Sequence, residues 1–348
     1  MTVYIGVDFH ARQQTISYLT TEEGEVKRRR LEHGEVAQVR EFYEQFADQQ
    51  VIVGFEASGY AAWFEELLEE LRCEIWIGDA KAIRTFAKRR QKNDRRDADL
   101  ILELLIQGDF PRIHRYSLES RTVLQQLRYR QRLVKMRTMI SNSLVFMAAS
   151  RGVILRRQFK SKRSVERFQQ LKLPAELARQ RGEQCQRLLE LKASLDQIER
   201  ELTLKAEADR RVQRLRTQYG IGPLTGLCLV HTLERVERFP NARKVTAYVG
   251  FDPVEDSSGE RRRIGSISKE GSRLLRYFLI EAGQVAIRRD LELARIYQRV
   301  LVRRGHAKAK VAIGRRLLVR AFIMLRDEID YAEFQRRGVA ARSSRNSH

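Results

Sequence analysis

The chain has 348 residues and a formal net charge of +22, with 67 Lys and Arg against 45 Asp and Glu. No run of about 18 apolar residues is present, which excludes a membrane-spanning helix, and no secretory signal precedes the first predicted strand. The three cysteines are Cys73, Cys185 and Cys228, too far apart for a zinc motif or a disulfide framework. We therefore expect a reduced, cytoplasmic protein that makes no use of a membrane.

The charge is unevenly distributed along the chain. Residues 1–110 contain 15 Lys and Arg against 21 Asp and Glu, whereas the remainder contains 52 against 24. An acidic first part joined to a strongly basic second part predicts a polyanionic partner, and nucleic acid is the default.

The first stretch, VYIGV at residues 3–7, is apolar and β-branched, which is typical of a buried strand that here ends in Asp8. The short segment QTISYL is expected to turn back as a second strand. A buried carboxylate is costly unless it is neutralised, and a metal ion, a strand-end cap or a salt bridge would each serve. A hairpin that delivers one Asp is also how a ribonuclease-H-like sheet begins.

The strand pattern continues at residues 50–56, QVIVGFE, which end in a second carboxylate, Glu56. Helices are expected at 35–46 and 60–72, followed by a strand at 73–78. This alternation predicts an α/β domain with a mixed sheet covered by helices.

The stretch KNDRRDADLILELL opens a predicted helix with Asp94 and Asp97, three residues apart and therefore on one face. Acidic residues also favour a first helical turn for purely structural reasons. Asp99 is expected to point elsewhere, with a surface role. If the strands that end in Asp8 and Glu56 are neighbours, all four carboxylates converge, and two Mg²⁺ ions would neutralise them for phosphodiester chemistry.

Two long helices are expected beyond this stretch, at 118–147 and 183–204, with Pro174 in the turn between them. The second carries a seam of apolar residues three and four apart, which predicts a helical hairpin or coiled-coil arm. Its Arg-rich faces are suited to a nucleic-acid backbone.

The last third of the chain carries two short motifs. Gly220-Ile221-Gly222 resembles a helix-hairpin-helix turn, in which backbone N–H groups approach a phosphate, although such a turn can also be purely structural. Ser257-Ser258-Gly259 lies in a polar turn before several arginines; a serine there is a nucleophile only if it is activated. Helices are expected at 273–287 and 308–325, and the basic tail from Arg336 is expected to be disordered.

The order of these pieces resembles a known family. VDFH, GFEASG, KNDRRDA, GIGPLT, AYVGFDP with SSG, and ISKEGSRLLR follow one another as in the DEDD transposases of the IS110 group of bacterial insertion sequences. The resemblance implies a RuvC-like ribonuclease-H-fold domain at 1–115, a coiled-coil arm at 116–210, a mostly helical transposase domain at 211–335 and a basic tail at 336–348.

The resemblance also implies a mechanism. Two Mg²⁺ ions, or Mn²⁺ in their place, are held by Asp8, Glu56, Asp94 and Asp97. A serine attacks DNA and forms a phosphoserine link. Ser258 is preferred and Ser257 is the alternative. A structured bridge RNA pairs with donor and target DNA, and the protein assembles as dimers and tetramers that act at the nucleoid.

Two alternatives stay open. A RuvC-like nuclease would cut DNA with two metals and water, without a covalent intermediate. A protein with a decayed site would bind nucleic acid without catalysis. The additional basic domain disfavours the first, and the presence of all four carboxylates disfavours the second.

Overall fold

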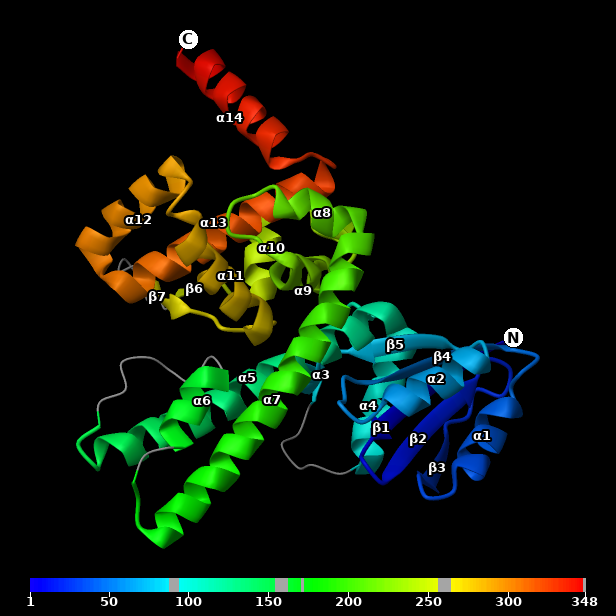
Figure 1. Ribbon diagram of the computed structural model, residues 1–348. Helices are drawn as coiled ribbons and strands as arrows, with labels where there is room; N and C mark the ends of the chain where they lie inside the picture. The colour runs from blue at the N-terminus through cyan, green and yellow to red at the C-terminus, as the bar shows by residue number, and fades with distance from the viewer. Residues whose placement is uncertain (88–93, 154–161, 170–171, 256–263, 347–348) are drawn as a thin grey trace. The chain divides into compact units, whose positions relative to one another are not determined.

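The computed structural model describes residues 1–87, 94–153, 162–169, 172–255 and 264–346 (Figure 1). The chain divides into two compact units, Met1–Arg115 and Tyr116–His348, which we call unit 1 and unit 2. Unit 1 is an α/β domain and unit 2 is almost entirely helical, so the predicted fold class is confirmed.

Unit 1 is built on one five-stranded mixed sheet with the strand order β3-β2-β1-β4-β5. The pairs β1–β2 and β2–β3 are antiparallel, whereas β1–β4 and β4–β5 are parallel. The strands are β1 (Thr2–Phe9), β2 (Gln13–Thr20), β3 (Lys27–Glu32), β4 (Gln50–Glu56) and β5 (Glu74–Gly78).

Helices cover both faces of this sheet. On one face, α1 (Val36–Glu44) and α2 (Ala62–Glu70) pack on the odd-numbered residues of β1 and β4 in an aromatic-rich core. On the other, α4 (Asp94–Gln107) packs through Leu104 and Leu105. Because side chains alternate along a strand, the odd and even residues of β1 and β4 face different helices.

Unit 2 begins with two long helices that pack along one another, α5 (Leu118–Ala149) and α7 (Ala175–Ala208). The predicted apolar seam is present, since Leu188, Leu195, Ile198 and Leu202 are buried. Helix α7 begins at Ala175, eight residues before the predicted start, because Pro174 occupies the N-cap position and supplies a fixed φ. The short helix α6 (Lys162–Gln169) also packs on α7.

The rest of unit 2 is a helical cluster around one large core. Its elements are α8 (Arg210–Arg216), α9 (Pro223–Leu233), η1 (Val236–Arg238), α10 (Ala242–Val249), β6 (Pro253–Glu255), β7 (Ile264–Ile267), α11 (Arg273–Ala286), α12 (Leu291–Arg304), α13 (His306–Arg326) and α14 (Tyr331–Asn346).

The predicted disorder of the tail from Arg336 is wrong, because α14 extends to Asn346. Local interactions explain the helix. Asp330 accepts a hydrogen bond from the Glu333 backbone N–H (2.8 Å), as an N-cap does, and Arg337 donates to Glu333 one turn earlier (2.9 Å).

Candidate active site at the ends of β1 and β4

Two glycines allow α4 to lie against the sheet. A Cβ atom on Gly6 of β1 would lie 2.5 Å from the backbone N of Leu102 and 2.6 Å from the carbonyl O of Ala98. A Cβ atom on Gly54 of β4 would lie 2.7 Å from the Leu105 side chain. A real Cβ atom does not approach backbone atoms as closely as at Gly6, so α4 requires glycine there, whereas at Gly54 the Leu105 side chain would have to shift.

The two glycines also show on which face of the sheet the two strand-end carboxylates lie. Asp8 and Glu56 follow Gly6 and Gly54 by two residues, so they emerge on the face of the sheet that α4 covers. The parallel register pairs Gly6 with Gly54 and Val7 with Phe55. The two carboxylates therefore stand at the carboxyl ends of neighbouring strands and on one face, as the sequence predicted.

His10 is a partner of Asp8 that the sequence analysis missed. Its Nε2 lies 3.1 Å from Oδ2 of Asp8, whose side chain is 14% exposed. His10 lies just beyond the end of β1 at Phe9, so the strand pattern alone does not predict the direction of its side chain. This contact fixes the orientation of the Asp8 carboxylate.

Helix α4 adds carboxylates above this face. Asp97 precedes the buried residues Ile101 and Leu104 by four and seven positions, so it lies on the sheet-facing stripe of the helix and is partly exposed. Asp94 is the first residue of α4, and its side chain lies outside the described part of the structure.

Asp99, for which the sequence predicted a surface role, is partly exposed and also makes specific contacts with the sheet. It accepts a hydrogen bond from Ser17 of β2 (2.6 Å) and a two-pronged contact from Arg28 of β3 (2.9 and 3.1 Å). Asp99 therefore ties the start of α4 to the antiparallel half of the sheet, two residues from Asp97.

The donor set is chemically suited to magnesium, which prefers carboxylate oxygens, water and phosphate. Among the side chains that the structure describes, however, no group of three or more His, Cys, Asp and Glu lies close enough to hold a metal ion. The structure thus brings Asp8 and Glu56 to neighbouring strand ends without assembling a three-ligand group from the described residues, and the metal site stays a prediction.

The predicted serine nucleophiles, Ser257 and Ser258, lie outside the described residues. The strands before and after them are β6 and β7, which pair antiparallel with Glu255 opposite Ile264.

The glycine turn between α8 and α9 is present, but packing accounts for its first glycine. Gly220 has φ +88°, and a Cβ atom there would lie 2.3 Å from the carbonyl O of Ala282 in α11. Around Gly222 there is open space. The requirement for glycine at 220 thus comes from close helix packing, and the phosphate-binding interpretation stays a prediction.

Comparison with known proteins agrees with this architecture. The model of the Transposase IS116/IS110/IS902 family matches residues 212–298, and a DEDD transposase model of the IS110 type matches residues 5–147. A probable family 20 transposase of Pseudomonas aeruginosa is 28% identical over 289 residues, which cover 82% of this chain and 84% of the relative.

Two further relatives are insertion-sequence transposases. The transposase for insertion sequence element IS1111A of Coxiella burnetii is 29% identical over 238 residues, 64% of each chain. The transposase for insertion sequence element IS1328 of Yersinia enterocolitica is 26% identical over 239 residues, 68% of this chain and 71% of the relative.

The mixed sheet with its strand-end carboxylates, the helical second unit and these matches define the chain as a DNA transposase. It belongs to the IS110 family of DEDD transposases. None of the helices in the described ranges is both long and apolar enough to cross a membrane.

Proposed function

We propose that this transposase cuts and rejoins DNA with a divalent-metal site in unit 1 and a serine nucleophile in unit 2. The observation that carries the metal site is the side-by-side placement of two carboxylates at parallel strand ends, beneath the start of α4. The proposed ligands are Asp8, Glu56, Asp94 and Asp97.

In this proposal the carboxylates of β1, β4 and α4 would hold the divalent ions that bind the scissile phosphate, and His10 orients Asp8. When bound, two magnesium ions, or manganese in their place, would stabilise the attacking and leaving oxygens of the displacement. Asp99 holds the start of α4 in place through Ser17 and Arg28.

The proposed nucleophile is Ser258, with Ser257 as the alternative. Its hydroxyl oxygen forms a bond to phosphorus while the bond to the leaving sugar oxygen breaks, and that oxygen takes up a proton. The phosphoserine link keeps the free energy of the phosphodiester, so attack by a second strand's hydroxyl restores the serine and rejoins DNA without nucleotide hydrolysis.

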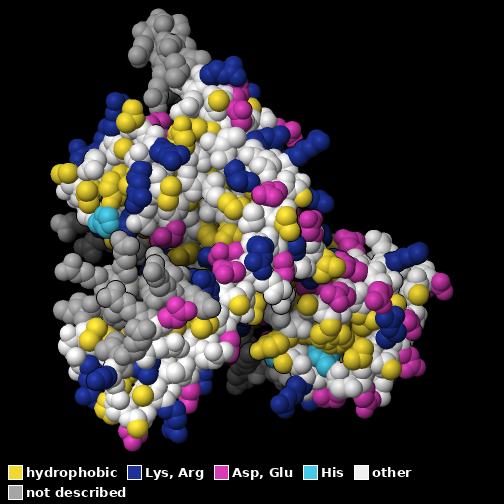
Figure 2. All heavy atoms as spheres, in the orientation of Figure 1, with side chains coloured by type: hydrophobic (Ala, Val, Ile, Leu, Met, Phe, Trp, Pro, Cys, Tyr) yellow, Lys and Arg dark blue, Asp and Glu magenta, His cyan; other side chains and the backbone are white. Residues whose placement is uncertain are grey.

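We also propose the finer features that the family resemblance implies: guidance by a bridge RNA, and assembly of dimers or tetramers. The charge distribution supports a large polyanion, since residues 116–348 carry 50 Lys and Arg against 24 Asp and Glu. Figure 2 shows basic side chains spread over unit 2, whereas acidic ones are frequent on unit 1. The functional division is proposed as 1–115, 116–210 and 211–335, followed by a basic tail at 336–348.

The metal site is tested by Asp8→Asn in the full chain, with Glu103→Gln as a matched control on the exposed side of α4. We expect Asp8→Asn to reduce strand transfer by about a thousandfold, the scale on which removing one transition-state contact acts. The assay contains donor DNA, target DNA and RNA transcribed from the flank of the gene. Mn²⁺ binding, followed by electron paramagnetic resonance, should weaken in parallel.

Nucleic-acid affinity separates a catalytic role from a structural one. Asp8→Asn should leave DNA and RNA binding unchanged, because the basic second unit supplies affinity, and Glu103→Gln should change nothing. A parallel loss of binding and strand transfer would show that Asp8 supports the fold instead.

The serine step is tested by trapping the covalent intermediate. Ser258→Ala should abolish a protein–DNA adduct that survives denaturing electrophoresis, and Ser257→Ala should retain it. The reverse pattern assigns the role to Ser257. Cleavage without an adduct in the unaltered protein would instead identify a RuvC-like nuclease that uses water.

A further inference from the structure

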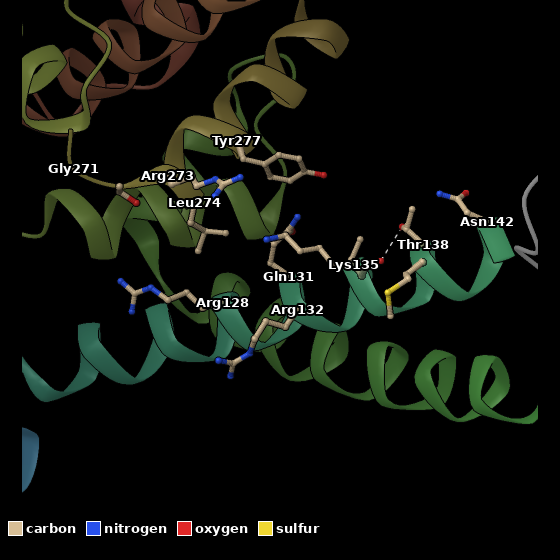
Figure 3. Close-up of a pocket in the computed structure, with 13 residues that line it drawn as sticks. Arg128, Gln131, Arg132, Lys135, Thr138, Asn142, Gly271, Arg273, Leu274 and Tyr277 are labelled. Carbon is tan, nitrogen blue, oxygen red and sulfur yellow. Dashed lines mark hydrogen bonds between the residues drawn. The ribbon is translucent and has the colours of Figure 1, made fainter. Parts of the chain in front are cut away.

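A pocket of about 970 Å³ lies within unit 2, between α5 and the first turn of α11. From α5 it is lined by Arg128, Gln131, Arg132, Val134, Lys135, Thr138, Met139 and Asn142, and from the α11 side by Gly271, Ser272, Arg273, Leu274 and Tyr277. Figure 3 shows Gln131 and Lys135 pointing from α5 toward α11, where Arg273 and Tyr277 face them. We call this pocket the α5–α11 groove.

The groove concentrates positive charge without a counter-ion. Four of its lining residues are Lys or Arg and none is Asp or Glu, although Figure 3 shows the Arg132 side chain on the side of α5 away from α11. Within the described ranges, none of these four cations forms an ion pair, whereas Arg130 on the same helix donates to Glu199 of α7 (2.7 Å). Like charges repel in a confined site, so the groove is suited to an anion with several charges.

The groove also has an exposed apolar and aromatic lining. Tyr277 is 40% exposed and Met139 is 67% exposed. The Tyr277 ring makes an edge contact with buried Phe278, at 5.8 Å between ring centroids. Duplex nucleic acid presents phosphates and hides its bases, so it would leave this lining unused. Unpaired nucleobases have free faces that stack on aromatic rings.

The wall formed by the start of α11 is rigid, as a binding wall should be. The guanidinium of Arg276 donates to the carbonyls of Val249 (2.7 Å) and Lys269 (2.7 Å), which holds the preceding loop. Ser272 caps the helix by accepting from the N–H of Leu275 (3.2 Å). Arg273 and Tyr277 therefore project from a fixed backbone.

We propose that the α5–α11 groove binds an unpaired stretch of polynucleotide. Phosphates contact Arg128, Lys135 and Arg273, and a base stacks on Tyr277. The proposal deepens the proposed function, because it assigns part of the nucleic-acid interface, but it requires neither the metal site nor the serine. Single-stranded DNA and single-stranded RNA share this chemistry, and the experiment distinguishes them.

The test is fluorescence anisotropy of the full chain with labelled 12-nucleotide dT, rU and a duplex of the same length, in EDTA. We expect Lys135→Gln/Arg273→Gln to weaken single-strand binding at least about tenfold and to reduce the slope of log K against log salt by about 1.4. Arg299→Gln/Arg303→Gln removes two exposed cations from α12 and should have little effect.

Tyr277→Leu separates stacking from charge, because it leaves the net charge unchanged. It should weaken binding of the preferred single strand about tenfold and leave duplex binding unchanged. Loss with dT alone identifies DNA as the occupant, and loss with rU alone identifies RNA. Equal losses on single strand and duplex, or equal losses in the α12 control, would overturn the proposal.

Since EDTA removes divalent metal, failure of this test is independent of failure at Asp8 or Ser258. Each variant is accepted only if its thermal unfolding midpoint matches that of the unaltered chain.

Discussion

The strand-end carboxylates of unit 1 and the network around Asp290 in unit 2 treat charge in opposite ways. In unit 1, β1 and β4 bring Asp8 and Glu56 to neighbouring strand ends, and α4, which covers that face, carries Asp97 on its sheet-facing stripe. In unit 2, Asp290 meets Arg320 and Tyr331 in a closed network of opposite charges and hydrogen bonds. The unit 1 arrangement places like charges near one another, whereas in the unit 2 network each buried charge has an oppositely charged partner.

The unit 2 network is almost completely removed from solvent. The side chains of Asp290 and Arg320 are 3% and 8% exposed. Arg320 donates to Asp290 (2.5 Å) and to the Tyr331 hydroxyl (3.1 Å), and Asp290 also accepts from the backbone N–H of Leu293 (2.9 Å). This network joins α12 and α13 to the start of α14.

The pKa values of Asp290 and Tyr331 reflect these hydrogen bonds. Burial alone would raise the pKa of Asp290, but hydrogen bonds from Tyr331, Leu293 and Arg320 outweigh it and lower the pKa below its usual value of 3.8. Burial and the hydrogen bond to Asp290 raise the pKa of Tyr331 to about 12. A network that satisfies its own charges stabilises a fold, whereas neighbouring carboxylates repel one another, and a divalent cation would relieve that repulsion.

The largest expected effect on stability comes from a substitution in the Asp290 network of unit 2. Asp290→Asn removes the buried partner of Arg320 and leaves it only the half-exposed Glu292 (2.9 Å), so it should destabilise unit 2 by about 3 kcal/mol. Both tryptophans, Trp63 and Trp76, lie in unit 1, so urea unfolding followed by tryptophan fluorescence reports unit 1. Far-UV circular dichroism reports mainly the helices of unit 2.

We expect the dichroism transition of Asp290→Asn to move to lower urea while the fluorescence transition stays in place. Asp8→Asn should move neither. A fluorescence shift as large as the dichroism shift would show that the two units unfold together, and an unchanged dichroism transition would contradict the structural role of the network.

The same network makes unit 2 sensitive to acid. Because the folded pKa of Asp290 is lowered, its contribution is fully present above the unfolded value near 3.8 and is lost as the pH falls through that value toward the folded pKa. The stability difference between the unaltered chain and Asp290→Asn should therefore shrink on acidification below about pH 4. A difference independent of pH would contradict this assignment.

Much of unit 1 could be predicted because its central strands are apolar runs bounded by turns. The strand that ends in Glu56 matches its predicted bounds, and the structure meets the condition that β1 and β4 are neighbours. Strand β3, KRRRLE, escaped prediction because it is an edge strand with a single buried residue, Leu31. Four of its six residues are Lys or Arg, so the segment shows no alternating apolar pattern.

The sequence predicted which residues belong to the candidate site but not which residues hydrogen-bond to them. Asp8 and Glu56 were recognisable because a carboxylate ended each apolar run. The anchoring of Asp99 by Ser17 joins residues 82 positions apart in the chain, and only tertiary structure brings them together. The satisfied cluster around Asp290 went unnoticed for the same reason, because its members come from three different helical segments.

A smaller loss of stability, confined to unit 1, is expected from a substitution at Gly6. Gly6→Ala places a methyl group where the backbone N of Leu102 and the carbonyl O of Ala98 stand, at 2.5 and 2.6 Å, so α4 must move away from the sheet. Such overpacking costs about 1–3 kcal/mol, which should appear in the fluorescence transition and not in the dichroism transition. Gly34→Ala is the matched control, because nothing lies within 4 Å of the added methyl group.

Strand transfer should fall much further in Gly6→Ala than the lost stability alone explains. At a cost of about 1–3 kcal/mol most of the chain stays folded below its transition, yet the displaced helix takes Asp97 away from Asp8 and Glu56. If strand transfer instead followed only the folded fraction, the carboxylates of α4 would have no part in the chemistry. Asp8 and Glu56 would then have to hold the metal alone, and the proposed role of the α4 carboxylates would be contradicted.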